Sequence, residues 1–465
     1  MKELPESLFR IYALSLPRGH GFGSRPPRNA WTTQDSITCG ILLCDDVDAS
    51  HGIMVMRRRV DDVWTVTSDE WGFANEAAAK ARIAELLLEG APPEPLPAGA
   101  RRRPALHDLQ QRSSSEIFDL LRSPTHHPAA WMLNQLYLAL PNPDANWVGD
   151  CQTGNFHTRL WEAQLLACFR EQGLLVTQPV ESPDFRIENR RGDVAWVEAV
   201  TANPSVAYNH VNSTQSKPPD AREELLFGPA ALRFAKTLRS KLQRRYHDLP
   251  HVADQPFMIA IADFQAPGSM LWSREGLIGY LYGEGVEVIE VDGRKQARSF
   301  PVTHLQGPSA FPAGLFANDL QCELSAVIFS NACSLAKFNR VAITRFGVPD
   351  GLRYMRIGEC FDRTPGALKA IPFCLDISSE EYLRLWPNGS EPWSAELEVF
   401  HNPFARNPVP FELLPEATHW FDREGEIVCS SIYEHSILWS KTMILNAKDR
   451  VPTLVDFISE SEPEP

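Results

Sequence analysis

Apolar and polar positions alternate most regularly between residues 156 and 264. FHTRLWEAQLLACFREQGLL, from Phe156, repeats its apolar residues with a helical period, and LLVTQPV, SPDFRIEN and VAWVEAVTAN follow as three strands. GPAALRFAKTLRSKLQRRYH predicts a second helix with Pro229 in its first turn, and PFMIAIADF predicts a buried strand. The expected order is therefore helix, three strands, helix, strand.

The rest of the chain predicts a mixed α/β protein of several parts. Apolar runs and one helical pattern predict a small α+β domain, whereas APPEPLPAGARRRP is rich in proline and predicts a linker that ends in the solvated run Arg101–Arg103. Beyond the core, the pattern is weak and ends in an acidic tail, ISESEPEP, that we expect to be disordered. The predicted parts are an α+β domain (1–90), a linker (91–104), a helical connector (105–150), a core (151–345) and a mixed C-terminal region (346–465).

Composition narrows the class of protein. The 465 residues carry a formal net charge of −14, which argues against a surface that binds nucleic acid everywhere but leaves room for a local basic groove. Nine cysteines without a CxxC spacing suggest neither a zinc ribbon nor a redox motif. No apolar run is long enough to span a bilayer, and the N-terminal stretch lacks the pattern of a signal peptide. We expect a cytoplasmic protein without a membrane partner.

Glu198 stands out because every neighbour in AWVEAV is apolar. Strand alternation places Trp196, Glu198 and Val200 on one face, and the opposite face is apolar as well. An isolated ionised carboxylate there costs several kcal/mol. A metal ion, a paired cation or a raised pKa would compensate.

Two further carboxylates accompany Glu198. Glu162 shares a helical face with apolar residues, and its alternative role is a pair with Arg159, three residues earlier. Asp184 lies on the strand that precedes the strand of Glu198. Pairing of these strands would bring the carboxylates of Asp184 and Glu198 together, and a divalent cation with oxygen ligands, Mg²⁺ or Mn²⁺, would relieve their repulsion.

The helix with Glu162, then Pro183-Asp184, then Glu198 on the next strand resembles the PD-(D/E)xK nuclease superfamily. The resemblance implies a restriction-endonuclease-like α-β-β-β-α-β core. It also implies a hydrolase that cuts phosphodiester bonds, in the first place of DNA, with Asp184, Glu198 and Glu162 around Mg²⁺. Restriction, repair and phage defence are the roles that it suggests. The blocks SPDFRIEN, WVEAVTANP, VIFSNACSLAKFNR and EVFHNP also resemble bacterial proteins of unassigned function, which implies no activity.

The family's lysine is missing, because Val200 occupies its place two residues after Glu198. In some members of the superfamily this lysine lies on a nearby helix, and the second helix offers Lys241 or, as a second choice, Lys236. The alternative is a non-catalytic scaffold that binds nucleic acid or protein on a degenerate nuclease fold.

The second helix also predicts a partner surface. Six basic residues lie within thirteen positions without an acid among them. Such a face could hold nucleic-acid phosphates, or it could be a solvated face that pairs with the protein's many acids. A protein partner or a homo-oligomer also stays open. The residues expected to contact nucleic acid are Arg233, Lys236, Arg239 and Arg244.

Three other polar clusters carry less information. His247 and His251 are four residues apart, but Pro250 breaks the helix between them, which argues against a zinc pair. FSNACSLAKFNR predicts either a binding loop or a turn with a helix cap. EVFHNP, beside prolines, is expected to be a loop.

Overall fold

The computed structural model describes residues 1–5, 27–45, 48–204, 226–291, 293–307 and 311–458. These residues divide into two compact units, which are considered separately. Unit 1 comprises residues 1–118, 130–181 and 185–193, and unit 2 comprises 119–129, 182–184 and 194–465. The expected acidic tail lies outside the described residues from position 459 onward.

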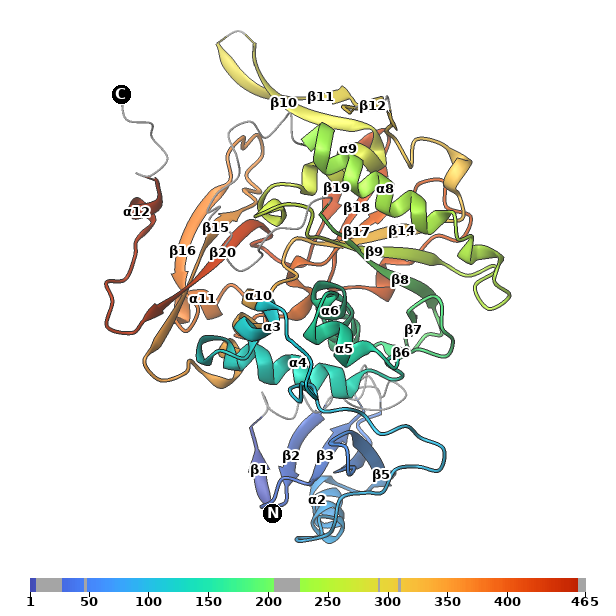
Figure 1. The fold of residues 1–465 in the computed structure, drawn as a ribbon, viewed down its shortest axis with the longest axis vertical. Coiled ribbons are helices and arrows are strands. Elements are labelled where there is room, and N and C mark those ends of the chain that lie inside the picture. Colours follow the sequence, from blue (N-terminus) through green and yellow to red (C-terminus); the bar gives the residue numbers. More distant parts are fainter. Residues whose placement is uncertain (6–26, 46–47, 205–225, 292, 308–310, 459–465) are drawn as a thin grey trace. The chain divides into compact units, whose positions relative to one another are not determined.

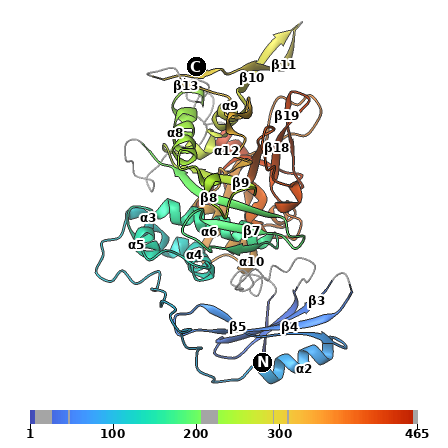
Figure 2. The ribbon, with the colours of Figure 1, turned by 90° about the vertical axis from the view of Figure 1, so that its right-hand side faces the viewer.

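Unit 1 begins with a five-stranded antiparallel sheet in sequential order. One helix, α2, covers a face of this sheet (Figure 2). Its Ala79 and Ile83 pack against Leu42, Ile53 and Val55 of the sheet. The expected α+β character of this segment is present. The elements are β1 (Lys2–Leu4), β2 (Pro27–Thr32), β3 (Thr38–Cys44), β4 (His51–Arg58), β5 (Trp64–Phe73) and α2 (Glu76–Leu86).

A helical region follows the proline-rich segment. Arg103, which we expected to be solvated, instead donates hydrogen bonds to the carbonyl oxygens of Tyr137 (2.7 Å) and Leu138 (2.9 Å) at the end of a helix. A guanidinium group suits this place because the last carbonyls of a helix have no partner within it. The elements are α3 (Glu116–Leu121), α4 (His127–Ala139), α5 (Trp147–Gln152), α6 (Phe156–Glu171), β6 (Leu175–Thr177) and β7 (Phe185–Glu188).

Unit 2 is built on six sheet strands in the order β19-β18-β17-β14-β9-β8 (Figure 1). β8, β9 and β14 run parallel to one another, and β17 is antiparallel to β14. Three of the six strands come from the predicted C-terminal region and continue the sheet of the predicted core. The strands are β8 (Val194–Ala202), β9 (Phe257–Asp263), β14 (Ala326–Ser330), β17 (Glu398–His401), β18 (Thr418–Arg423) and β19 (Glu426–Ser430).

The helices α8 (Ala231–Leu242) and α9 (Arg274–Tyr282) cover one face of this sheet. Ala235 and Leu238 of α8 join Trp196 and Val200 of β8 in one buried core. The second helix was expected to run through Tyr246, but α8 ends at Leu242. Arg245 has a left-handed backbone (φ 53°), and a separate 3₁₀ turn, η4 (Tyr246–Asp248), follows. This break re-aims the residues after α8 toward β8.

The remaining elements of unit 2 lie around that sheet. A two-stranded hairpin, β10–β11, projects from the body of the unit (Figure 1), and a three-stranded sheet has the order β16-β15-β20. Among the described residues, the helices are all too short or too polar to cross a membrane. These elements include β10 (Glu284–Val291), β11 (Arg294–Pro301), β12 (His304–Leu305), β13 (Phe311–Pro312), α10 (Leu335–Phe346), β15 (Leu352–Cys360), β16 (Ile371–Asp376), α11 (Glu380–Leu383), β20 (Ile437–Asn446) and α12 (Leu454–Ile458).

The chain is thus mixed α/β. Along the sequence, α6, β6, β7, β8, α8 and β9 follow one another in the order that the apolar pattern predicts.

Candidate functional site

Glu198 lies in the middle of β8 and points toward the segment that ends α8. Its Oε1 atom accepts hydrogen bonds from Lys241 Nζ (2.7 Å) and from the Tyr246 hydroxyl (2.7 Å). Glu198 is 4% exposed, so this ion pair is largely removed from water. Burial and the hydrogen bond to Glu198 raise the pKa of Tyr246 above its usual value, which keeps the phenol protonated as a donor.

Val200, where the family has its lysine, is buried in the core beneath α8. An ammonium group at this position would lie among Ala235, Leu238 and Ile261 and would need a partner there. Lys241 instead approaches the same face of β8 from the helix. The structure thus places a lysine beside Glu198 without placing one on the strand.

Asp184 is anchored to the strand that carries Glu198. Its Oδ2 accepts a hydrogen bond from the backbone N–H of Ala199, at 2.7 Å. Arg244, just after α8, is exposed and close enough for the charges of both Asp184 and Glu198 to raise its pKa, after the larger effects of Tyr246. Arg244 therefore lies within electrostatic range of both carboxylates.

The second oxygen of Glu198, Oε2, is buried and has no hydrogen-bond partner among the residues that the structure describes. A carboxylate oxygen in this state has lost its hydration without a replacement, and a cation is one ligand that supplies the replacement. The described residues include no group of three or more His, Cys, Asp or Glu side chains arranged to hold a metal ion. Two protein carboxylates are still compatible with Mg²⁺, because this ion is commonly held by one or two carboxylates with water and phosphate as further ligands.

Glu162 lies in unit 1. It pairs there with Arg159, which is the alternative role considered from the sequence. Arg159 donates to its Oε1 at 2.9 Å, and the Trp147 indole donates to its Oε2 at 2.8 Å. Burial raises the pKa of Glu162, and Arg159 opposes this shift. Both oxygens are thus occupied by neighbours within unit 1, including one that was not foreseen, Trp147.

The predicted nucleic-acid contacts divide into two groups. Lys236 and Arg244 are exposed. Arg239 instead lies 4.2 Å above the Phe311 ring and donates to the Pro312 carbonyl oxygen at 3.3 Å. Arg233 is half-buried, and its Nε atom is shielded from solvent. Of the two exposed cations, Arg244 follows the end of α8 near Lys241, whereas Lys236 lies in the middle of the helix.

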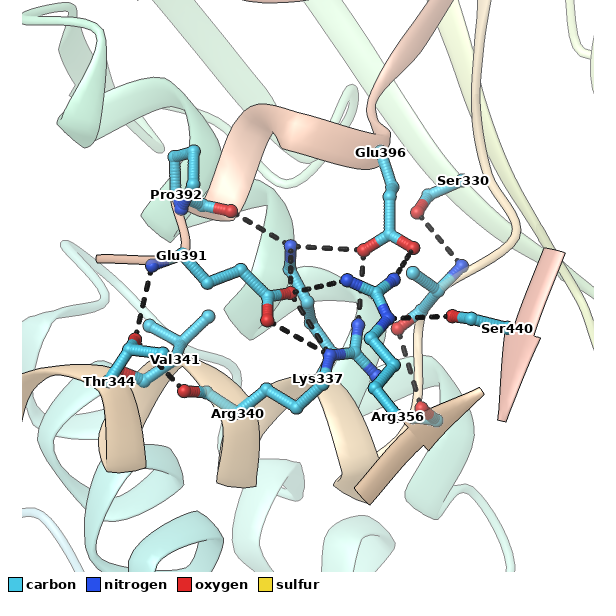
Figure 3. Close-up of polar contacts among 12 residues, drawn as sticks. Ser330, Lys337, Arg340, Val341, Thr344, Arg356, Glu391, Pro392, Glu396 and Ser440 are labelled. Atoms are coloured by element: carbon cyan, nitrogen blue, oxygen red, sulfur yellow. Dashed lines mark hydrogen bonds and ion pairs between the residues drawn. The ribbon is translucent and has the colours of Figure 1, made fainter. Parts of the chain in front are cut away.

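A second polar centre, which the sequence did not reveal, is a network of five buried charged side chains in unit 2 (Figure 3). Lys337 Nζ lies 3.0 Å from Glu391 and 3.2 Å from Glu396, and Arg340 forms ion pairs with the same two carboxylates. Arg356 is also paired with Glu396, and Tyr382 donates to Glu391 at 2.5 Å. The network joins α10, β15, α11 and η7 (Trp393–Glu396).

This charge network is internally compensated. Burial alone would raise the pKa of both glutamates, but Arg340 and Lys337 outweigh it at Glu391, and Arg356 and Lys337 do so at Glu396, so both pKa values lie below normal. FSNACSLAKFNR contains the start of a helix, because α10 begins after Ser334, whose side chain makes no capping hydrogen bond. The network ties its elements together, and both of its carboxylates, Glu391 and Glu396, are occupied by its own cations.

EVFHNP is also not the loop that we expected, because its first four residues form β17, a buried strand in the sheet. His401 Nε2 lies 2.8 Å from His419 Nδ1, and His419 Nε2 lies 3.0 Å from the Leu414 carbonyl oxygen. A carbonyl only accepts, so His419 carries its proton on Nε2 and accepts from His401. Burial lowers the pKa of both histidines, which favours neutral rings.

The histidine pair predicts a loss of stability in acid. Burial and the neighbouring His419 lower the pKa of His401 to about 3, from 6.5 in the unfolded chain. Because the unfolded state takes up the proton first, the contribution of His401 is complete above pH 6.5 and is lost as the pH falls toward 3. In His401→Gln, the decline in the free energy of unfolding between pH 6 and 4 should be less steep by up to about 1.4 kcal/mol per pH unit.

Urea unfolding at several pH values measures this slope. The exposed His304 provides the control, and His304→Gln should keep the wild-type slope. Equal slopes for the two variants would contradict the assignment of a depressed pKa to His401.

Comparison with known proteins adds no relative: no family model, no curated protein and no solved structure matches the chain.

Proposed function

We propose that the chain is a divalent-metal-dependent nuclease whose site is formed by Asp184, by Glu198 on β8 and by Lys241 at the end of α8. The observation that carries the proposal is the state of Glu198. One of its oxygens is held by Lys241 and Tyr246, and the other is buried without a hydrogen-bond partner in the described part of the chain. A bound cation would supply that partner. It would also neutralise charge on a phosphate and lower the pKa of a coordinated water.

The protein's own groups have distinct tasks in this site. Asp184 and Glu198 provide the carboxylate oxygens, and the Ala199 N–H and Tyr246 hydroxyl fix their orientations. Lys241 lies 2.7 Å from Glu198, with about a fifth of its side chain exposed, so its ammonium can donate to a water or a phosphate oxygen beside the carboxylates. Arg244 and Lys236 are exposed cations that would hold the backbone of a nucleic acid, in the first place DNA.

The second candidate function is a scaffold without catalysis. Its support is the ion pair itself, since Lys241 already compensates one buried carboxylate oxygen and a structural pair needs no metal. The two functions differ in the response to divalent cations, because a structural ion pair is indifferent to them.

Cleavage assays separate the two functions. Single-stranded DNA, duplex DNA and RNA are offered to the wild type with Mg²⁺, Mn²⁺ or EDTA. We expect metal-dependent cleavage that falls about a hundredfold in Lys241→Met, the lower end of the effect of a group that assists proton transfer. The matched control is Lys236→Met, an exposed lysine five residues earlier on α8, which should weaken the binding of nucleic acid and leave kcat unchanged.

An active wild type with equal kcat in Lys241→Met would show that Lys241 is only the structural partner of Glu198. No cleavage of any substrate by the folded wild type would favour the scaffold.

A further inference from the structure

The end of α8 and the segment after it contact both parts of the proposed site, β8 with Glu198 and the residues before Asp184. Lys241 and Tyr246 bind Glu198, and His251, five residues beyond Tyr246, reaches the residues before Asp184. His251 Nε2 lies 3.0 Å from the carbonyl oxygen of Ser182. Since a carbonyl only accepts, His251 is the donor and carries a proton on Nε2.

We infer that His251 is a positioning residue, which holds the 182–184 segment so that the Asp184 carboxylate meets β8 beside Glu198. This inference rests on the proposed function. His251 itself would touch no ligand, but it would hold in place the segment whose carboxylate does. The Asp184 side chain is anchored by the Ala199 N–H at 2.7 Å. The hydrogen bond from His251 gives the same segment an anchor on its backbone, two residues earlier.

The imidazole of His251 is itself held in place by β8. Its ring packs against the indole of Trp196, with ring centroids 4.9 Å apart and an angle of 58° between the planes. The Trp196 Nε1–H donates to Gln255 Oε1 at 2.8 Å, and its backbone N–H donates to the Pro256 carbonyl oxygen. Trp196 is two residues before Glu198, so β8 fixes both the glutamate and the residue on which His251 rests.

His247 and His251 have different partners, although they are only four residues apart. His247 faces Asp248, 3.5 Å away, whereas His251 turns toward Ser182. The two rings thus have different partners, and only His251 is connected to the carboxylate site.

Two variants test the role of His251. His251→Phe keeps a ring against Trp196 and removes the donor, whereas His251→Gln offers an amide N–H to the Ser182 carbonyl oxygen. Hydrogen exchange of the Ala199 amide, resolved by fragmentation mass spectrometry, reports whether Asp184 still holds β8. We expect roughly tenfold faster exchange in His251→Phe, the effect of losing one supporting hydrogen bond, and exchange near the wild-type rate in His251→Gln.

Mn²⁺ titration of the same proteins gives the second readout. His251→Phe should bind Mn²⁺ about 10- to 100-fold more weakly, as is typical when a group that orients a metal ligand is removed, and His251→Gln should recover most of the affinity. Wild-type exchange and wild-type Mn²⁺ affinity in His251→Phe would overturn the inference. A wild type that binds no Mn²⁺ would overturn the proposed function instead, and Ala199 exchange alone would then decide whether His251 holds Asp184.

Discussion

Glu391→Gln is expected to lower the free energy of unfolding by about 3–5 kcal/mol, the range measured when one partner of a buried ion pair is removed. The wild-type network sets three cations against two carboxylates, with every charged side chain at most 3% exposed. The substitution leaves Glu396 as the only carboxylate for Lys337, Arg340 and Arg356. It also replaces one of the carboxylate oxygens that face Arg340 with an amide nitrogen, and an amide nitrogen cannot accept a hydrogen bond.

Two further variants serve as controls for the free energy of unfolding. One removes a buried cation of the network, and the other removes an exposed carboxylate elsewhere. Lys337→Met leaves two guanidinium groups facing two carboxylates, so we expect a smaller loss than in Glu391→Gln. Glu380→Gln removes a carboxylate that is 83% exposed and pairs with Arg384, and its cost should be at most about 1 kcal/mol because water screens the pair.

Equilibrium urea unfolding, followed by tryptophan fluorescence and circular dichroism, measures these differences. The free energy is taken from the transition in which both signals coincide, because a chain with more than one unit need not unfold in a single step. A Glu391→Gln variant as stable as Glu380→Gln would show that the network is not the tie between α10 and the strands that its geometry indicates.

Glu198→Gln is expected to lower metal-dependent cleavage by about a thousandfold. The isosteric amide can still accept from Tyr246 and Lys241, so the change acts mainly on charge. A carboxylate that holds the metal contributes several kcal/mol of charge stabilisation, and each 1.36 kcal/mol corresponds to a factor of ten in rate. The rate under single-turnover conditions, with thermal unfolding as a check on the fold, measures the effect.

Glu188→Gln is the matched control for that variant. Glu188 is a half-buried carboxylate that pairs with Arg186 on β7, at 2.7 Å, and it has no contact with Lys241 or Tyr246 among the described residues. Its loss should leave the cleavage rate within about a factor of two, because partly exposed pairs contribute little. Equal losses of cleavage rate in Glu188→Gln and Glu198→Gln would show that Glu198 has no special role in cleavage.

Local pattern was enough to predict much of this arrangement. Alternation along VAWVEAV placed Trp196, Glu198 and Val200 on one face, and that face packs against α8. The resemblance to the nuclease superfamily suggested Lys241 as the replacement for the missing lysine, and in the structure its side chain lies 2.7 Å from that of Glu198. The shared face of β8 follows from the direction of side chains on a single strand.

The features that the sequence did not predict depend on partners far apart in the chain. Arg340 and Glu391 are separated by 51 positions, and neither shows any local sign of burial. Tyr246 was assigned to the apolar stripe of a continuous helix, whereas the left-handed Arg245 ends that helix and lets the phenol meet Glu198. For the same reason, the His251 contact with Ser182, across 69 positions, could not be found from spacing.

The central claim is that Asp184 and Glu198 together bind a divalent cation, and Mn²⁺ titration followed by electron paramagnetic resonance tests it most directly. The wild type is compared with Asp184→Asn and Glu198→Gln at matched protein concentration. The account predicts one Mn²⁺ bound per wild-type chain, displaced by Mg²⁺, and strongly weakened binding in both variants, each of which stays folded. Binding that is absent from the wild type, or unchanged in both variants, would contradict it.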